Sequence, residues 1–166
     1  NQIEVREAQL TEPTTINATP YFPYHVSGQF GVNSVVNVQP GAHFRFATDA
    51  KIFVWSGGSL NCIGTASSRI SFTGNDATPG SWHGIRYISS PSNLNQFDYC
   101  DLSYGGGSAD YQGVLTLGSG SYVRIGHSTI SNSARYAVFN ASDAGTFIDD
   151  LNNTYSGNSF KCAIAS

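Results

Sequence analysis

Acidic, basic and imidazole side chains recur at similar intervals in the second half of the chain. When residues 97–106 are aligned with 123–133, and residues 128–133 with 153–158, these side chains fall into two columns. The first column contains Asp98, Arg124 and Asp149, and the second contains Asp101, His127 and Asn152. If the aligned segments are stacked strands, the members of a column lie about 4.8 Å apart. Two carboxylates flanking an arginine, beside an Asp–His pair, would suit chemistry on a polysaccharide.

Two reactions are compatible with these columns. In a polysaccharide lyase, a basic residue removes the proton α to a uronate carboxylate while a cation or Ca²⁺ neutralises the acid. In a glycoside hydrolase, Asp98 or Asp101 would pair with Asp149 as acid and base. Both reactions predict the same catalytic residues, which are Asp98, Asp101, Arg124, His127 and Asp149.

A structural role for the same side chains is the stronger interpretation. Opposite charges on neighbouring strands pair across a sheet and keep it soluble, and each pair contributes about a few tenths of a kcal/mol. The chain has no dense Asp cluster of the Ca²⁺-binding type, and its eight Lys and Arg residues are scattered. The sequence therefore predicts no metal site and no cofactor, with Ca²⁺ expected only for a lyase, and it favours a protein that is not an enzyme.

Aromatic side chains are a second kind of candidate. Ligand sites combine apolar and aromatic surface with a few polar groups, and charged residues make up only 11% of this chain. The candidate carbohydrate-binding residues are Trp82, Tyr87, Tyr104 and Tyr111. Core packing is the competing interpretation, and for Trp82 it is the default because of the size of the side chain.

The elements that position these residues are short strands. From about Tyr24 onward, short apolar runs alternate with Gly, Ser, Asn and Asp, and no helical periodicity is sustained. The alignment sets Ser103 on Thr129, a shift of about 26 residues, and Thr129 on Thr154, a shift of about 25 residues, and such periods are typical of a solenoid. Asn132 and Asn158 then fall near one turn and predict a short asparagine ladder.

Five short motifs follow one another in an order found in one protein family. They are Pro40-Gly41, Gly57–Leu60 with Gly64-Thr65, Ile70–Gly74, Trp82–Ile85 and Tyr99–Gly106. Through them, residues 35–160 resemble bacterial extracellular right-handed β-helix proteins, which are related in fold to pectate lyases. The resemblance implies an all-β fold, a single-stranded right-handed parallel β-helix of about six coils. Such coils are scaffolds in lyases, glycosidases and adhesins, so the fold does not define the function.

Patterning divides the chain into two parts. Residues 1–23 lack the repeat and predict an N-terminal cap or entry strand, and residues 24–166 predict the β-helix domain. Residues 158–166 form an apolar, strand-like run without a polar cap. This run predicts an end coil that is covered by a second copy of the chain, forming a dimer, or by a further domain of a longer protein.

Composition excludes several kinds of partner. A net charge of −3 from few ionisable groups gives no electrostatic footprint for nucleic acid. No apolar run approaches the length of a transmembrane helix. Cys62, Cys100 and Cys162 are an odd number at wide spacings. They predict buried thiols, with one disulfide as the alternative.

The function that these observations favour is a non-catalytic secreted or cell-surface module that binds a carbohydrate or another cell-surface component. A polysaccharide lyase or glycoside hydrolase is the first alternative. An ice-binding protein is the second, because flat walls of low charge can match a lattice and Thr129 aligns with Thr154.

Overall fold

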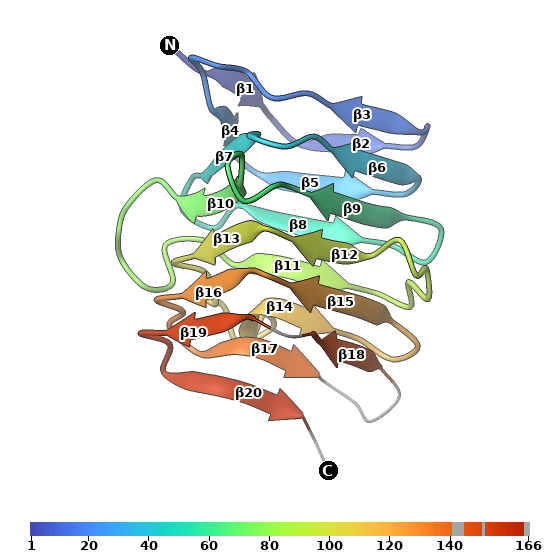
Figure 1. The fold of residues 1–166 in the computed structure, drawn as a ribbon, viewed down its shortest axis with the longest axis vertical. Coiled ribbons are helices and arrows are strands. Elements are labelled where there is room, and N and C mark those ends of the chain that lie inside the picture. The colour runs from blue at the N-terminus through green and yellow to red at the C-terminus, as the bar shows by residue number, and fades with distance from the viewer. Residues whose placement is uncertain (141–144, 151, 165–166) are drawn as a thin grey trace.

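Three parallel sheets wind around one core in a β-solenoid (Figure 1). The computed structural model describes residues 1–140, 145–150 and 152–164. In that part of the chain every element is a strand, and each strand pairs in parallel with strands of the neighbouring coils. The prediction of an all-β parallel solenoid of about six turns is therefore confirmed. Its right-handed sense stays a prediction.

Each coil contributes one strand to each sheet, except the last, whose described strands belong to sheets A and B only. Sheet A consists of β1 (Ile3–Val5), β4 (Tyr24–Val26), β7 (His43–Phe46), β10 (Ile70–Gly74), β13 (Cys100–Ser103), β16 (Thr129–Ser131) and β19 (Thr154–Ser156). Sheet B consists of β2 (Ala8–Leu10), β5 (Gln29–Val32), β8 (Lys51–Val54), β11 (Gly84–Tyr87), β14 (Gly113–Leu117), β17 (Tyr136–Asn140) and β20 (Phe160–Ile164). Sheet C consists of β3 (Thr14–Ile16), β6 (Val35–Val38), β9 (Ser59–Ile63), β12 (Gln96–Asp98), β15 (Tyr122–Gly126) and β18 (Thr146–Asp149).

Alternation of side chains explains why these short runs form strands. In β7, Phe44 and Phe46 are buried, whereas the two polar residues of the strand are exposed. Because the coils are stacked, inward rings of equal position lie on one another. Phe44 stacks on its sheet partner Phe72 with ring centroids 4.9 Å apart. Phe46 pairs with Gly74, so the ring that stacks on it, at 4.1 Å, comes from Trp82 in the segment before β11. Burying one such ring contributes about 1.5–3 kcal/mol, so these aromatic columns hold neighbouring coils together.

The first 23 residues contain a complete coil. Strands β1, β2 and β3 pair with β4, β5 and β6, one pair in each sheet. The segment expected as a cap or entry strand therefore lies within the three sheets as their terminal strands. Its residues are mostly exposed or half-buried, and this is why the alternation of buried and exposed residues is absent from its sequence.

The register differs by two residues from the first sequence alignment. Asp101 pairs with Thr129 and Ser103 with Ser131, so Ser103 does not lie on Thr129. The second alignment is confirmed, because Thr129 pairs with Thr154 and Ile130 with Tyr155. On sheet A equivalent residues are 28 apart in the first step and 25 apart in the second, and on sheet C they are 28 and 24 apart, since the loops between strands differ in length.

An amide ladder forms, although not where the sequence predicts it. Residue Asn132 has φ 54° at the turn after sheet A, and Asn158 accepts a hydrogen bond from the backbone N–H of Ser133. The stacked amides lie on sheet C instead. Asn61 donates to Asn37 at 2.8 Å, and Gln96 donates to Asn61 at 3.0 Å. The three side chains therefore link β6, β9 and β12 on the outside of the solenoid.

Candidate functional site

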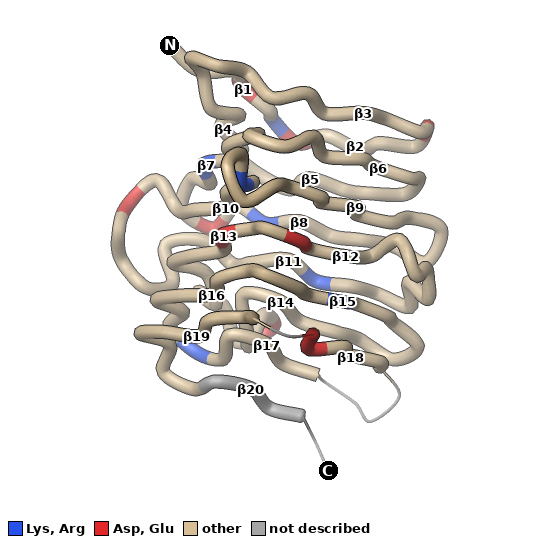
Figure 2. Tube along the Cα trace, in the orientation of Figure 1, with Lys and Arg blue, Asp and Glu red and all other residues tan. Residues whose placement is uncertain are grey.

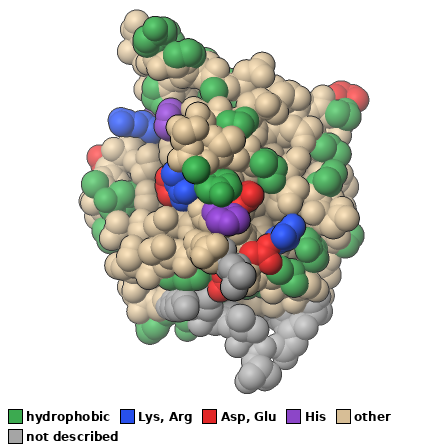
Figure 3. All heavy atoms as spheres, in the orientation of Figure 1, with side chains coloured by type: hydrophobic (Ala, Val, Ile, Leu, Met, Phe, Trp, Pro, Cys, Tyr) green, Lys and Arg blue, Asp and Glu red, His purple; other side chains and the backbone are tan. Residues whose placement is uncertain are grey.

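Charged residues occur on successive coils where the chain passes from sheet C to sheet A (Figure 2), and their side chains lie close together on that face of the molecule (Figure 3). We call this edge of the solenoid the C–A corner. Its charged residues are Arg69, Asp98, Asp101, Arg124, Asp149 and Asp150, with His127 among them. The whole chain has only eight basic and eleven acidic residues. The concentration of charge at one corner therefore distinguishes this surface from the rest of the molecule.

An imidazole–carboxylate pair stands at the centre of the C–A corner. Nδ1 of His127 donates to Oδ1 of Asp98 at 2.9 Å. The imidazole also stacks on Tyr99, with ring centroids 4.6 Å apart and planes 5° from parallel. Tyr99 and His127 are each the first residue after the sheet C strand of their coil, with φ values of 50° and 46°. This left-handed backbone is uncommon for residues other than glycine. Because both residues adopt it in successive coils, their rings point in the same direction and stack.

The guanidinium of Arg69 binds Asp101 above this pair. Nε and Nη2 donate to the two carboxylate oxygens at 2.8 Å each. The same guanidinium donates to the backbone carbonyls of Cys100 and His127, both at 3.0 Å. The hydrogen bonds to Asp101 raise the pKa of Arg69 from its ordinary value, so the side chain stays charged. Arg69 thus joins the loop before β10 to β13 and to the turn before β16.

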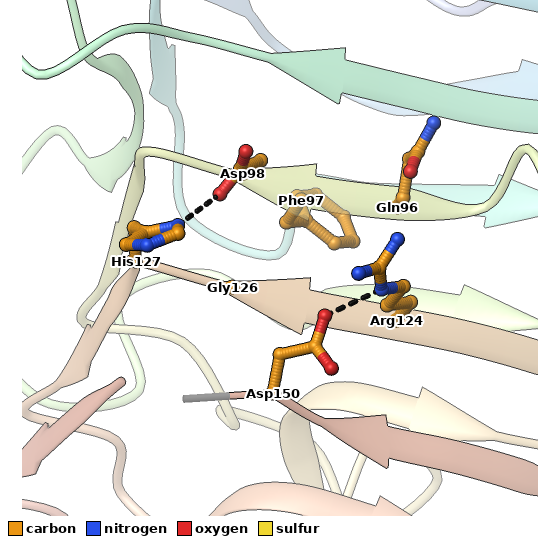
Figure 4. A pocket seen from close by; sticks show the side chains of 7 residues that line it. All are labelled: Gln96, Phe97, Asp98, Arg124, Gly126, His127 and Asp150. Atoms are coloured by element: carbon orange, nitrogen blue, oxygen red, sulfur yellow. Dashed lines mark hydrogen bonds and ion pairs between the residues drawn. The ribbon is translucent and has the colours of Figure 1, made fainter. Parts of the chain in front are cut away.

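A small hollow of about 80 Å³ lies beside the imidazole, on the sheet C side of the corner (Figure 4). It is lined by Gln96, Phe97, Asp98, Arg124, Gly126, His127 and Asp150. Arg124 donates through Nε to Asp150 across the hollow. A Cβ atom built on Gly126 would lie 3.2 Å from Oδ1 of Asp98 and 3.7 Å from Cβ of Asp150. The hollow therefore exists because residue 126 has no side chain.

The first predicted column, of Asp98, Arg124 and Asp149, is wrong. Asp98 pairs in the sheet with Gly126, and Arg124 pairs with Gln96 and Ile148. Asp149 pairs with Ile125. The two-residue error in the first alignment moved every residue of β12 relative to β15. A separate one-residue error in the second alignment placed Asp149 on Arg124, which pairs with Ile148. Asp98 and Arg124 nevertheless line the same hollow, because both side chains point outward from adjacent strands.

The second predicted column is wrong for Asp101 for the same reason. Asp101 pairs with Ser71 and Thr129 on sheet A, and Tyr99 occupies the position above His127. Asn152 has φ 71° and occupies the equivalent turn one coil below. The Asp–His contact exists with a different partner, since Asp98 binds His127.

Asp149 does not face Asp98 or Asp101. It lies on β18, two strands from Asp98, and accepts hydrogen bonds from Nδ2 of Asn153 at 2.8 Å and from the hydroxyl of Tyr155 at 2.9 Å. The neighbouring Asp150 lines the hollow instead. Sequence reasoning missed Asp150 and Arg69. The sequence did contain a signal for Asp150. Ile125 must point inward, so Gly126 and the residue that pairs with it must point outward.

Three of the four candidate carbohydrate-binding residues are buried. Trp82 and Tyr87 have no exposed surface, and Tyr111 is 3% exposed. The indole of Trp82 donates to the carbonyl of Ser103 at 2.8 Å inside the solenoid, and burial raises the pKa of Tyr87 and of Tyr111. Stacking of a sugar on these three rings is therefore excluded in this conformation. Tyr104 is half-buried at a turn with φ 63°, and its role stays a prediction.

Only two residues of the threonine column that ice binding requires lie together on sheet A within the described residues. Thr129 pairs with Thr154, and the column continues upward through Asp101 and Ser71. A charged residue held by Arg69 thus interrupts the hydroxyl groups. Ice binding stays a prediction.

Among the described residues, no group of three or more His, Cys, Asp or Glu side chains could hold a metal ion. Cys62 and Cys100 are free, buried thiols, and the side chain of Cys162 lies outside the described residues. No helix suited to crossing a membrane occurs among these residues. The cover expected for the end coil at residues 158–166, a second copy of the chain or a further domain, stays a prediction. Residues 165 and 166 lie outside the described residues.

No protein-family model matches the chain, and neither a curated protein nor a solved structure matches it. The relationship to pectate-lyase-like proteins therefore stays a prediction from the five motifs. Fold and site together define a class, which is a parallel β-solenoid with a charged and aromatic corner on its outer surface.

Proposed function

We propose that the chain is a non-catalytic, secreted or cell-surface module that binds a carbohydrate through the C–A corner. The observation on which this proposal depends is the parallel stack of Tyr99 and His127 between a bidentate Arg69–Asp101 pair and the hollow beside Arg124. Location outside the cell is supported by the resemblance to extracellular β-helix proteins and by a surface in which hydroxyl and amide groups replace most charges.

The corner has the groups that a sugar requires. A pyranose presents an apolar face, which packs on an aromatic ring, and a rim of hydroxyl groups, which pair with planar charged side chains. The His127 side chain is 43% exposed, and Asp98 and Arg124 lie on either side of the adjoining hollow. Their partners already hold these side chains in place, so little conformational entropy is lost on binding.

Pairing of the carboxylates favours binding over catalysis. A glycosidase needs two carboxyl groups that face the scissile bond from opposite sides. Here both oxygens of Asp101 accept hydrogen bonds from Arg69, Asp98 is bound by His127, and Asp149 is bound by Asn153. Each candidate acid or base therefore has a structural partner in place of a substrate.

The test is a panel of glycans and polysaccharides scored for binding and for release of reducing or unsaturated ends, with and without Ca²⁺. Tyr99→Asn and His127→Asn remove the rings and keep a residue that accepts left-handed backbone. We expect each to weaken binding by at least about tenfold, which corresponds to about 1.4 kcal/mol.

The matched variant is Tyr104→Asn, because Tyr104 also has positive φ but lies at the turn after sheet A. Binding that survives in Tyr104→Asn and is lost in the other two variants supports the C–A corner. Release of product by the unmodified chain would overturn the non-catalytic part of the proposal. A chain that binds no member of the panel would overturn carbohydrate binding itself.

A further inference from the structure

A second hollow lies on the outer face of sheet A, beneath the loop that connects β3 to β4. We call this loop, residues 17–23, the overhanging loop. The hollow is lined by Thr19, Pro20, Tyr21, Phe22 and Pro23 of the loop and by His43, Arg45, Ser71 and Thr73 of β7 and β10. The C–A corner described above uses none of these residues.

Hydrogen bonds and prolines hold the overhanging loop in shape. The hydroxyl of Tyr24 donates to the carbonyl of Asn17 at 2.8 Å and closes the base of the loop. Within the loop, the hydroxyl of Thr19 donates to the carbonyl of Phe22. Pro20 and Pro23 restrict the backbone further, because each ring fixes its own φ. The loop therefore presents its side chains from a constrained backbone.

Two aromatic rings of this loop are exposed to solvent. Tyr21 is 84% exposed and Phe22 is 38% exposed, and their rings meet edge to face with centroids 6.4 Å apart. Apart from Phe160, the other Phe, Tyr and Trp side chains are buried or half-buried, and Phe44, Phe46 and Phe72 are in the core. Large apolar surface held exposed beside a hollow is typical of a binding site.

The floor of the hollow contains a cation without a counter-charge. Arg45 is exposed, and no carboxylate or side-chain hydrogen bond reaches its guanidinium within the described residues. In contrast, Arg69 and Arg124 each bind an aspartate. Hydroxyl and imidazole groups surround Arg45. Nδ1 of His43 lies 2.7 Å from the hydroxyl of Ser71, and the hydroxyl of Ser103 donates to Thr73 at 2.9 Å.

From this geometry we infer that the hollow is a subsite for an acidic sugar, one that bears a carboxylate or a sulfate group. The fork of Arg45 matches the two oxygens of such a group and binds them with two parallel hydrogen bonds. The ring of Tyr21 packs on the sugar face, and Ser71 and Thr73 bind its hydroxyl groups. This inference rests on the proposed carbohydrate binding, because it names the class of ligand.

The two sites are joined across the face of sheet A. A third hollow, beside the loop that precedes β10, shares His43 and Ser71 with the second hollow and also contains Arg69 and Asp101. Arg69 in turn donates to the carbonyl of His127 at the C–A corner. From β7 to β16 the path crosses three strand spacings of about 4.8 Å, roughly 14 Å in all. An oligosaccharide can therefore contact both the acidic-sugar subsite and the corner.

Isothermal titration calorimetry of the full chain tests the subsite with three probes: a uronic-acid oligosaccharide, a sulfated oligosaccharide and a neutral oligosaccharide of similar length. We expect Arg45→Gln to weaken binding of an acidic probe by at least about tenfold and to leave the neutral probe unchanged, since a charge-assisted hydrogen-bond pair is lost. Whether the carboxylate or the sulfate probe shows the loss identifies which group the subsite reads.

Arg135→Gln is the matched control, because Arg135 is also exposed and lies away from the hollow, between β16 and β17. The substitution changes the net charge by the same amount as Arg45→Gln. Tyr21→Ala should weaken the binding of every probe that occupies the subsite. Tyr21→Phe keeps the ring and should bind as the unmodified chain does. An unchanged affinity of Arg45→Gln for both acidic probes, or an equal loss in Arg135→Gln, would overturn the subsite.

Failure of the proposed function has a different signature. If Arg45→Gln has no effect while His127→Asn abolishes binding, the subsite is refuted and the corner stands. If Arg45→Gln weakens acidic probes while Tyr99→Asn and His127→Asn bind normally, the subsite stands and the corner is refuted. If none of the three probes binds, both are refuted.

Discussion

Arg69 and Asp101 form a bidentate pair between side chains 32 positions apart in the chain, with both N···O distances at 2.8 Å. The guanidinium also donates to the carbonyl of His127, one coil further down. One side chain thus links three successive coils at the edge where the other charged groups gather. Parallel strands contact only their neighbours in a solenoid, so a connection that spans three coils has an effect on cooperativity beyond its own energy.

Removal of this link should destabilise the solenoid. We expect Arg69→Ala to lower the free energy of unfolding by about 1–2 kcal/mol, because two charge-assisted hydrogen bonds are lost from a partly exposed pair. Chemical denaturation followed by circular dichroism measures the change. Arg124→Ala is the control, since Arg124 is more exposed than Arg69, 52% against 31%, and its removal should cost less than about 1 kcal/mol. Equal costs for the two variants would contradict a special role for Arg69.

A side chain at residue 126 should block the hollow without unfolding the chain. In Gly126→Ala the new Cβ approaches Oδ1 of Asp98, the atom that His127 binds, to 3.2 Å, so the carboxylate must shift and the hollow becomes smaller. We expect carbohydrate affinity to fall by about tenfold while the free energy of unfolding changes by less than about 1 kcal/mol. Gly57→Ala creates a similar contact, 3.3 Å from the carbonyl of Asn33, at another corner and should bind normally. Normal binding by Gly126→Ala would remove the hollow from the site.

Stability should fall in acid partly through Glu4. Hydrogen bonds from Ser27 and then from His25 lower the pKa of Glu4 below its ordinary value of 4.5. A carboxyl group with a lowered pKa stabilises the fold above its unfolded pKa, and the contribution is lost as the pH falls through the folded pKa. Urea unfolding at about pH 6 and about pH 3.5 should therefore show a smaller acid-dependent loss for Glu4→Gln than for the unmodified chain. Glu12→Gln, an exposed change in the same coil, should leave the loss unchanged.

The thiols of Cys62 and Cys100 should resist modification in the folded chain. Both are buried, and burial raises the pKa of each thiol, so the reactive thiolate is scarce and inaccessible. In a Cys162→Ser background, a thiol reagent at about pH 8 should label neither residue until denaturant unfolds the coils. Labelling that proceeds at the same rate with and without denaturant would show that the region around β9 and β13 opens readily.

Composition and pattern were sufficient for the architecture. Short apolar runs, turn residues between them and a period in the twenties predict a parallel solenoid, and the aromatic column of Tyr24, Phe44 and Phe72 follows from that stacking. The set of charged residues was also readable, since Asp98, Asp101, Arg124 and His127 do meet at one corner. These properties depend on the alternation of side chains along each strand, which is local in sequence.

Only the tertiary structure decided which of these residues touch. A register error of two residues keeps every side chain on the same face of its strand, so the pattern of buried and exposed residues contains no signal against it. The error placed Asp98 on Arg124 instead of Gly126 and Asp101 on His127 instead of Thr129. The sequence did not identify Arg69 as the partner of Asp101, for a related reason. Arg69 follows a loop, and loop length sets which coil it reaches, whereas residue type alone does not.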